Sequence, residues 1–432
     1  MRNFHPIRVL FFALSLTMAF ACSHTSKEVK SNIINVAGSI GGGRITDISE
    51  VVSDIRYIPL ETSSVSLVGE TQRIFLENDR IYIKDRNYSM SIFDLNGKFI
   101  TKFCKRGRGP EEYSLGAEIY PAPHSGEILV NSLGESLSIL RYNISGRLIG
   151  RFDTPKDTNF RTTWPVMLND NAYVATINIY FNKPVFSSVV YDSLGKTKLL
   201  VPIPELAPYK SFDLPEFVLM NKDGALTTVK DESKIKKYSN PDRPFLYKFK
   251  DNIRLVYDSN DTVLSIDANM HIDTSYIFNY GEYKNNSMDR SSISATKGKH
   301  VSIIGRNKMM ETEGFLFMQF ALRDYAHEPY EKLRANRKGY YALNDAYAIY
   351  NKKSGEFWFL NQTEKGVLGF RENLMGGPPF WPTYVSSDNS VVMIIPAISL
   401  IEYAETHKVS SELSEIIKKL KDTDNPVVVI AK

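Results

Sequence analysis

Short apolar or alternating runs follow one another along this chain from Ser53 onward, as in RIYIKD (80–85), EILVNS (127–132) and AYVATINIYF (172–181). Clusters of Asn, Asp, Gly and Pro separate the runs. Alternation of apolar and polar residues is typical of a β-strand with one buried face, and clusters of turn residues mark the strand ends. The pattern therefore predicts an all-β domain.

Helical periodicity is scarce until SSELSEIIKKLKD (410–422), near the C-terminus. Ser411 can cap the N-terminus of this helix, and the glutamates come early and the lysines late, which suits the helix dipole. The β-branched run NPVVVI (425–430) follows. We therefore expect one short helix before a final strand.

Three similar segments recur at a constant spacing: IFDLNGKFITKF (92–103), RYNISGRLIGRF (141–152) and VYDSLGKTKLLV (190–201). Each has an aromatic residue, then Asp or Asn, two further residues, Gly and a basic residue. Phe93, Tyr142 and Tyr191 are 49 residues apart. Asp or Asn begins a tight turn and Gly adopts the positive φ that returns the chain, so each segment predicts a hairpin.

One hairpin in about 50 residues is typical of a β-propeller, in which each sheet buries its faces against neighbouring blades. Looser copies occur at 265–278, where the glycine is lost, and at 349–360, which has one extra residue. About six units fit the chain. We predict a six-bladed β-propeller of four-stranded antiparallel blades over residues 48–432, with insertions at about 206–245 and 283–340.

The two ends of this region both have strand character, in SDIRYIPLET (53–62) and NPVVVIAK (425–432). A sheet shared between the two ends would close the ring and remove two exposed strand edges. We therefore expect both ends to complete the last blade.

The N-terminus has a basic head with Arg2 and Arg8, then an apolar run from Val9 to Ala21 that ends directly before Cys22. The run has the length of a signal-peptide core and is too short for a membrane anchor. MAFAC resembles the lipobox of bacterial lipoproteins, with Ala19 where the pattern prefers Leu. We expect residues 1–21 to be a signal peptide and Cys22 to be lipidated; the alternative is an ordinary secretory signal. Residues 22–47 are polar and rich in Gly and Ser, which predicts a flexible tether.

The net charge is +4, and removal of residues 1–21 takes away Arg2 and Arg8 and no acidic residue, which leaves +2. A nearly neutral chain with 24 tyrosines and 24 phenylalanines is not typical of a polyanion-binding protein, so we expect no nucleic-acid partner. With Cys22 lipidated, Cys104 has no intramolecular partner for a disulfide.

IRYIPLET (55–62), GRGPEEY (107–113), the FDLNGK hairpin, GGPPFWP (376–382) and NPVVVI together resemble the six-bladed β-propeller lipoproteins of Bacteroidota. These are similar in shape to NHL and TolB-type propellers. The resemblance covers about residues 50–432 and implies an envelope location and a propeller fold, but no settled reaction. This chain departs from the family at Glu111, where Gly is typical, and at ENLM before GGPPFWP, where the family tends to have acidic residues.

CKRGRGPEEY (104–113) lies after the first repeated hairpin and before the next unit. We interpret it as the crossing between two blades, because Gly107 and Gly109 allow a sharp turn and no helix follows to make a phosphate loop. Such crossings border the mouth of the central channel. Arg106, Arg108 and Tyr113 are therefore candidates to hold an anionic or sugar ligand there.

Aromatic residues near predicted blade junctions are the other candidates: Trp164, Phe380 and Trp381. Their faces could stack on sugar rings, although aromatic residues also pack between the sheets of propellers.

The seven histidines show no zinc-binding spacing, and no G-x-S-x-G motif is present. Calcium held by channel carboxylates stays open, because such ligands need not be near in sequence. Catalytic residues and cofactors are otherwise not assigned by the sequence.

These observations favour a lipid-anchored binding or interaction module of the cell envelope, with a glycan, a peptide or an envelope protein as its ligand. The alternative is a calcium-dependent hydrolase or lactonase-like enzyme in the channel. A third hypothesis is a structural lipoprotein without a small ligand. We expect the outer membrane, facing the periplasm.

Overall fold

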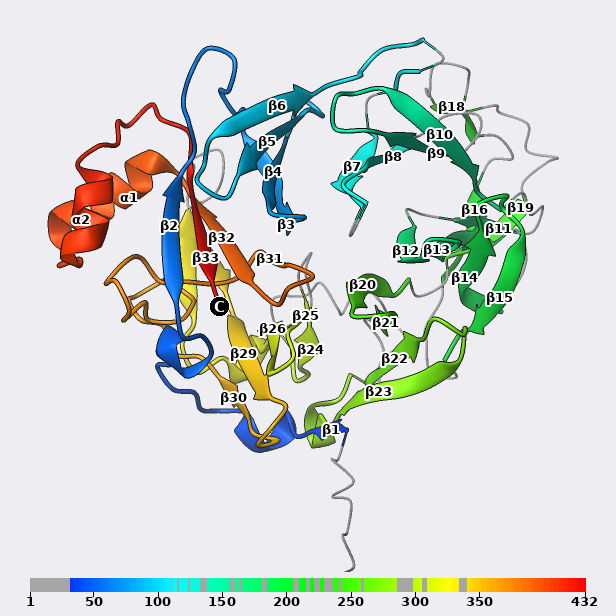
Figure 1. The fold of residues 1–432 in the computed structure, drawn as a ribbon. Coiled ribbons are helices and arrows are strands. Elements are labelled where there is room, and N and C mark those ends of the chain that lie inside the picture. Colours follow the sequence, from blue (N-terminus) through cyan, green and yellow to red (C-terminus); the bar gives the residue numbers. More distant parts are fainter. Residues whose placement is uncertain are drawn as a thin grey trace, which may run out of the picture. The chain divides into compact units, whose positions relative to one another are not determined.

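The computed structural model describes residues 32–109, 111–114, 116–122, 125–132, 138–155, 160–162, 165–180, 185–204, 210–214, 218–220, 226–228, 236–240, 243–257, 260–285, 298–304, 309–333 and 340–432. The main sheets of this part of the chain are six blades around a common centre, as Figure 1 shows, and two small hairpins are separate from them. Each blade has a core of four strands. The predicted six-bladed β-propeller is confirmed.

The first four blades follow one another along the chain, each from its innermost to its outermost strand. Blade 1 has β3 (Thr71–Glu77), β4 (Arg80–Asp85), β5 (Met90–Asp94) and β6 (Phe99–Phe103); blade 2 has β7 (Glu118–Pro121), β8 (Ile128–Ser132), β9 (Ser138–Tyr142) and β10 (Leu148–Asp153). Blade 3 has β12 (Val166–Asn169), β13 (Ala172–Tyr180), β14 (Phe186–Asp192) and β15 (Thr197–Pro202); blade 4 has β20 (Phe245–Phe249), β21 (Asn252–Val256), β22 (Thr262–Ile266) and β23 (Ile272–Phe278).

The last two blades depart from this simple order. In blade 5, β24 (Ser302–Ile303) and β25 (Met309–Glu311) both pair with β26 (Phe315–Ala321), which is followed by β29 (Asp345–Asn351) and β30 (Phe357–Phe359). Blade 6 has β31 (Tyr384–Val385), β32 (Val391–Ile395) and β33 (Val427–Ala431), and its outermost strand is β2 (Ile55–Pro59) from the other end of the domain.

The pairing of β2 with β33 closes the ring, as the sequence predicts. The strands are antiparallel, with Tyr57 opposite Val429, and the C-terminus lies beside β2 in Figure 1. The last blade therefore joins both ends of the propeller by main-chain hydrogen bonds.

The repeated Asp or Asn makes the same turn between the third and fourth strands of five blades. Its side-chain oxygen accepts hydrogen bonds from backbone N–H groups that follow it, at Asp94, Asn143, Asp192, Asp267 and Asn351. The glycine of the motif has φ values of 79° at Gly97, 82° at Gly146 and 74° at Gly195. The fourth copy has Met270 at this place, and it adopts the same left-handed conformation with φ 66°. The hairpin explanation of the repeat is thus correct even where the glycine is lost.

Among the described residues, six clusters of buried apolar side chains lie between neighbouring blades, one at each junction. The aromatic residue of each repeat belongs to the cluster shared with the preceding blade. Phe93 packs with blade 6, Tyr142 with blade 1 and Tyr191 with blade 2, and all three are fully buried. Each blade therefore buries its faces against its neighbours.

Residues 32–47 pack on the propeller, which differs from the flexible tether predicted for residues 22–47. Strand β1 (Ile33–Ile34) pairs in parallel with β23 as a fifth strand of blade 4. Ile34 and Val36 are fully buried in the cluster between blades 4 and 5. Residues 22–31 lie outside the described part of the chain. The sequence prediction failed here because the segment is polar overall, although Ile34 and Val36 attach it to the propeller.

Two helices lie between β32 and β33. The predicted helix is α2 (Ser411–Ile417), and Ser410, not Ser411, caps it by accepting a hydrogen bond from the Leu413 N–H at 3.1 Å. Helix α1 (Ala397–Thr406) is not predicted from the sequence. None of the helices in the described ranges has the length and apolar character needed to cross a membrane.

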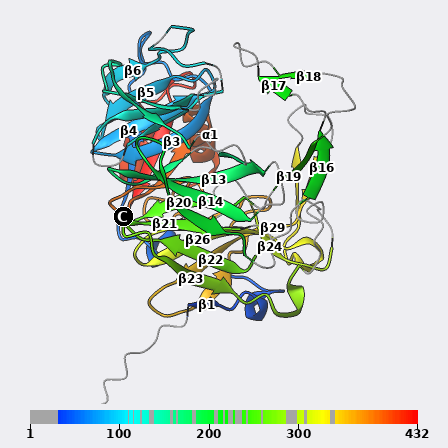
Figure 2. The same ribbon diagram turned by 90° about the vertical axis from the view of Figure 1, so that its right-hand side faces the viewer.

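Additional strands lie mostly in the two regions that the sequence predicts as insertions, whereas β11 lies before the first of them. Strand β13 also pairs with β11 (Phe160–Thr162) and with β19 (Lys236–Asn240), which pairs with β16 (Lys210–Leu214); Figure 2 shows β16 and β19 extending beyond the blades. Two separate hairpins are formed by β17 (Val218–Met220) with β18 (Leu226–Thr228) and by β27 (Tyr330–Leu333) with β28 (Tyr340–Leu343). The range 283–340 also contains β24, β25 and β26, which belong to blade 5 itself.

Candidate functional site

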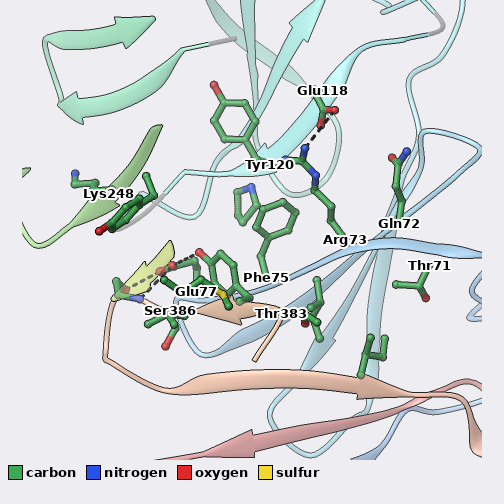
Figure 3. Close-up of a pocket in the computed structure, with 18 of the residues that line it drawn as sticks. Thr71, Gln72, Arg73, Phe75, Glu77, Glu118, Tyr120, Lys248, Thr383 and Ser386 are labelled. Carbon is green, nitrogen blue, oxygen red and sulfur yellow. Dashed lines mark hydrogen bonds and ion pairs between the residues drawn. The ribbon is translucent and has the colours of Figure 1, made fainter. Parts of the chain in front are cut away.

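A cavity of about 1320 Å³ lies at the centre of the propeller, and Figure 3 shows part of its wall. The innermost strands β3, β7, β12, β20, β25 and β31 all contribute lining residues. Residues 396–398 at the start of α1 line one part of it, as do Asp422, Asp424 and Pro426. A large concave site with apolar walls and a few polar groups is the usual form of a ligand-binding site, so this cavity is the candidate site.

Aromatic rings form much of the wall, and they come from blades 1, 2, 4 and 6: Phe75, Tyr120, Phe245, Tyr247, Phe249 and Tyr384. Phe75 and Tyr384 meet edge to face, with ring centroids 5.4 Å apart. Such rings offer broad apolar surface at low conformational cost, and they suit the faces of sugars or apolar side chains.

Polar contacts between blades fix the wall, and three of them use carboxylates of the lining: the buried Glu77 and Glu311, and the half-buried Glu118. Each carboxylate accepts hydrogen bonds from a neighbouring blade. Because a buried charge is costly unless it is paired or hydrogen-bonded, each of these contacts holds two blades in a defined position.

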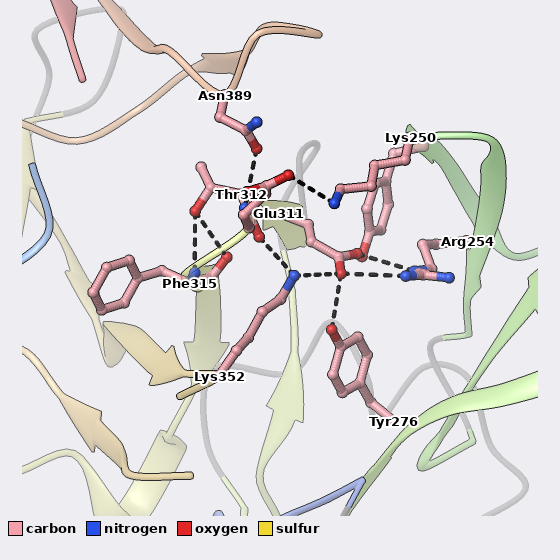
Figure 4. Close-up of polar contacts among 10 residues, drawn as sticks. Lys250, Arg254, Tyr276, Glu311, Thr312, Phe315, Lys352 and Asn389 are labelled. Atoms are coloured by element: carbon pink, nitrogen blue, oxygen red, sulfur yellow. Dashed lines mark hydrogen bonds and ion pairs between the residues drawn. The ribbon is translucent and has the colours of Figure 1, made fainter. Parts of the chain in front are cut away.

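Glu311 is the most extensively bonded of the three, as Figure 4 shows. Its side chain is fully buried and accepts hydrogen bonds from Arg254 Nε at 3.0 Å and Lys352 Nζ at 2.7 Å. The hydroxyls of Tyr247 and Tyr276 also donate to it, at 2.9 and 2.8 Å. Arg254, Tyr247 and Tyr276 belong to blade 4, so this carboxylate of blade 5 connects the two blades.

The charges at this junction explain the direction of its pKa shifts. Burial raises the pKa of Glu311, but the hydrogen bond and charge of Arg254 and the charge of Lys352 lower it by more, so the pKa lies below its usual value. Burial and the charge of Glu311 raise the pKa of Tyr247, which keeps its hydroxyl a hydrogen-bond donor. The junction therefore holds one carboxylate against two cations.

Glu118 connects blades 2 and 1. It accepts a hydrogen bond from Lys84 Nζ at 2.9 Å, and Arg73 Nη2 lies 3.7 Å from its other oxygen. Figure 3 shows Arg73 and Glu118 facing each other at the cavity wall. The Lys84 side chain is 1% exposed, so its charge depends on this carboxylate.

Glu77 connects blades 1 and 6, and its hydrogen-bond partners among the described residues are neutral. The Tyr384 hydroxyl donates to Oε1 at 2.6 Å, the Ser387 hydroxyl to Oε2 at 2.6 Å, and the Ser387 N–H to Oε1 at 3.2 Å. No described cation forms an ion pair with it. Glu77 is 4% exposed and lines the cavity.

Lys248, on β20, is a half-buried cation of the lining. Its ammonium donates to the Leu168 carbonyl of blade 3 at 3.1 Å, and no carboxylate of the described residues forms an ion pair with it. Burial lowers its pKa, while the negative charges of Asp251, Asp170 and Glu77 act in the opposite direction.

Gln72 adds an acceptor to the wall. Its side-chain oxygen is buried and has no hydrogen-bond partner among the described residues. Within the same part of the chain, no group of three His, Cys, Asp or Glu residues could hold a metal ion. The calcium ligands that the sequence leaves open are therefore not identified in this lining.

The three candidates from the crossing between blades do not line the cavity. Tyr113 is fully buried, stacks against Phe103, and donates its hydroxyl to the Tyr88 carbonyl at 2.7 Å. Arg106 and Arg108 are exposed, and Arg106 forms a backbone bridge with Tyr113. Residues 104–117 join β6 to β7, so this stretch is the predicted crossing.

The aromatic candidates of blade 6 belong to its core. Phe380 is 1% exposed, and its backbone pairs with Phe370. Trp381 stacks on Tyr347 with ring centroids 3.8 Å apart. Neither lines the cavity. Trp164 and Cys22 lie outside the described residues.

Sequence reasoning missed the residues that do line the cavity, above all Glu77, Lys248 and Glu311. They come from strands that are far apart in the chain, and none belongs to a recognisable motif. These three residues share only a position by which they could be found: each residue lies at or near the end of the first strand of its repeat.

The comparisons with known proteins agree with the fold. A family model described as a domain of unknown function (DUF4934) matches residues 31–432. A protein of Bacteroides fragilis described as a "putative exported protein" has a similar structure, with a TM-score of 0.59 and 16% identity over 93% of this chain and 99% of that chain. A DUF4221 family member from Bacteroides vulgatus gives a TM-score of 0.37 and 15% identity over 71% of this chain and 84% of that chain. No curated protein matches the chain. At 16% identity the likeness to the Bacteroides fragilis protein shows the fold alone.

Proposed function

This chain belongs to the DUF4934 family, and from its fold and cavity we propose that it is an exported binding module that takes its ligand in the centre of the propeller. One observation carries the proposal. The innermost strands of all six blades line a cavity of about 1320 Å³ whose wall combines aromatic rings with polar and charged side chains. Propeller blades surround a central channel, and here that channel is large enough to take a ligand.

The ligand classes consistent with this wall are the glycans and peptides expected from the sequence, together with a segment of an envelope protein. Aromatic rings contact all three well. The paired carboxylates Glu118 and Glu311 already hold the blades together, so they are not the free acid and base of a hydrolase. Binding is therefore the better account of the cavity.

The N-terminal features support an envelope location for this module. We propose that residues 1–21 direct export, that lipid on Cys22 anchors the chain, and that the propeller faces the periplasm from the outer membrane. Multiple acyl chains anchor a protein far better than one. A short connection follows from the packing of residues 32–47, since no more than about ten residues separate Cys22 from β1.

The test uses a variant in which a larger side chain fills part of the cavity. Thr71 lines it on β3 and is half-buried, whereas Thr197 on β15 is exposed on the outermost strand of blade 3. A thermal-shift screen of the full-length protein against glycans and peptides should find a stabilising ligand, because occupancy at about a hundred times Kd adds about 2.7 kcal/mol. The shift should be lost in Thr71→Trp and kept in Thr197→Trp. A shift that survives Thr71→Trp would place the ligand elsewhere.

A further inference from the structure

Glu77 and Lys248 are charged side chains of the cavity wall that form no ion pair with a described residue. Asp251, Asp422 and Asp424 also lack one among the described residues, but Asp251 and Asp422 are exposed, and Asp424 accepts a hydrogen bond from the Lys421 N–H. Glu118, Lys250 and Glu311 each form an ion pair with a described residue. Glu77 and Lys248 instead have neutral partners: two hydroxyls and an N–H for the carboxylate, and a carbonyl for the ammonium. Glu77 and Lys248 are therefore a less exposed carboxylate and a less exposed ammonium of the wall that no opposite charge of the described chain contacts.

The two groups come from different blades and share one cavity. Glu77 is the last residue of β3 in blade 1, and Lys248 is on β20 in blade 4; both appear in Figure 3. A charge in a wall of low dielectric is stabilised strongly by an opposite charge in contact with it. A ligand that carries an ammonium and a carboxylate would supply both missing partners at once.

The rest of the wall suits a peptide main chain. Strands β3, β7, β20 and β31 are each the last strand of their sheet, so their inner edges carry backbone groups without a neighbouring strand. An extended peptide can bond to such an edge. The unpartnered oxygen of Gln72 is a further acceptor for a peptide N–H. Phe75 and Phe245 offer apolar surface to side chains, and the volume is larger than the usual range of about 300–1000 Å³ for small-molecule sites.

We propose that the central cavity binds short peptides with free termini, holding the N-terminal ammonium at Glu77 and the C-terminal carboxylate at Lys248. This inference rests on the proposed function, and it names the ligand class of the same site. It separates peptides from neutral glycans, which would leave both charges without a partner.

The first test changes the ligand and leaves the protein intact. A mixed tripeptide library is offered to the full-length protein in four versions: free, N-acetylated, C-amidated and blocked at both ends. Binding is measured by native mass spectrometry and by thermal shift. We expect the free version to bind, and each block to weaken binding about tenfold or more, because each removes one charge pair.

The outcomes separate this inference from the proposed function. Equal binding of the free and doubly blocked libraries would overturn the inference and leave cavity binding intact. Binding of a neutral glycan but no tripeptide, with loss in Thr71→Trp, would do the same. Failure of every peptide and glycan to bind would overturn both.

Matched variants assign each terminus to its residue. In Glu77→Gln the effect of N-acetylation should disappear, and in Lys248→Met the effect of C-amidation should disappear. Glu412→Gln and Lys419→Met change exposed charges in and directly after α2 that do not line the cavity, and they should keep both effects. Thermal unfolding shows that each variant is folded. Persistence of both effects in Glu77→Gln and Lys248→Met would overturn the assignment.

Discussion

Glu311 shows how a single side chain connects two blades. Arg254, Tyr247 and Tyr276 reach it from blade 4, and Lys352 reaches it from its own blade. The Phe249 ring lies 4.1 Å from Lys352 Nζ and 5.3 Å from Arg254, so it shields both cations from water. Removal of the carboxylate would leave two buried cations that face each other.

Glu311→Gln should therefore destabilise the protein by about 3 kcal/mol at pH 7, as is typical when one partner of a buried ion pair is lost. The pKa of Glu311 lies below its usual value, so its stabilisation is complete above the unfolded-state pKa and is lost as the pH falls through the lower, folded-state value. The difference between wild type and Glu311→Gln in urea unfolding should shrink as the solution is made acidic.

Glu313→Gln is the control, because Glu313 pairs with Lys250 while its side chain is 63% exposed. It should unfold at nearly the wild-type urea concentration. A constant gap between wild type and Glu311→Gln at every pH would contradict the role assigned to the Glu311 charge.

Alanine substitutions at two turn glycines separate the cost of a left-handed backbone conformation from the cost of a steric clash. Gly97 and Gly355 have similar φ values, 79° and 76°. A Cβ at Gly97 would collide with the Pro59 carbonyl oxygen of blade 6, whereas a Cβ at Gly355 would meet open space. Gly355→Ala should cost about 1–2 kcal/mol for the left-handed conformation alone.

Gly97→Ala should cost more than Gly355→Ala, because the turn must also move away from β2. Chemical denaturation of both variants measures the difference. Equal costs would show that the turn of blade 1 moves freely and that its contact with blade 6 contributes little.

At the same scale, the site could not be read from the sequence. Tyr113, Phe380 and Trp381 attract notice because they lie in conspicuous local motifs, yet they pack in the core. Glu77 and Lys248 lie in ordinary strands, and only the ring brings them to one cavity. A local sequence pattern indicates where a residue lies in its strand. It does not indicate which distant strand lies across the cavity from it.

Among the elements, the closing strand β33 has a special position. It lies between β32 and β2, so Val429 is paired on both sides, with Met393 and Tyr57. Proline at this position would remove a ladder hydrogen bond in a central strand. Val429→Pro should therefore open the ring and unfold the domain cooperatively at a much lower temperature.

Ile149→Pro provides the comparison. Ile149 is 44% exposed in β10, the outermost strand of blade 2, at an irregularity in the pairing with β9. Proline is tolerated best at edges and bulges, so this variant should melt close to wild type in calorimetry. Similar melting of both variants would mean that closure by β2 and β33 is not what limits stability.

The repeat made most elements predictable, because each hairpin contains its own turn chemistry from Asp94, Asn143 and their equivalents. Elements outside the repeat were not predictable in this way. Strand β1 depends on a partner about 240 residues away, and α1 has no polar cap to mark its start, since Pro396 precedes it without a side-chain hydrogen bond. A strand that pairs with a distant partner, or a helix that starts without a side-chain cap, has no local sequence pattern by which it could be predicted.

On the scale of the whole molecule, we propose that the N-terminus directs the propeller to the cell envelope. If Cys22 is lipidated, mass spectrometry of the protein from its own membranes should find a mature chain that starts at a modified Cys22. Cys22→Ser should release the protein into the soluble fraction without changing its melting temperature, because Cys22 precedes the packed residues. An unmodified N-terminus at another residue would favour an ordinary secretory signal.

The six blades are also joined as one unit around the cavity. Apolar clusters fill each junction, and carboxylates connect blade 1 with blades 2 and 6 and blade 4 with blade 5. A wall fixed in this way is preformed, so a ligand would not have to order it on binding.

The most direct test of ligand binding in the central cavity is the rate at which a maleimide modifies Thr71→Cys, made in a Cys104→Ser background because Cys104 is exposed. The free-ended tripeptide library or any ligand from the screen is added at saturation. We predict that it slows modification of Thr71→Cys about tenfold or more and leaves Thr197→Cys unchanged. Equal rates at Thr71→Cys with and without a bound ligand would contradict the assignment of the central cavity as the binding site.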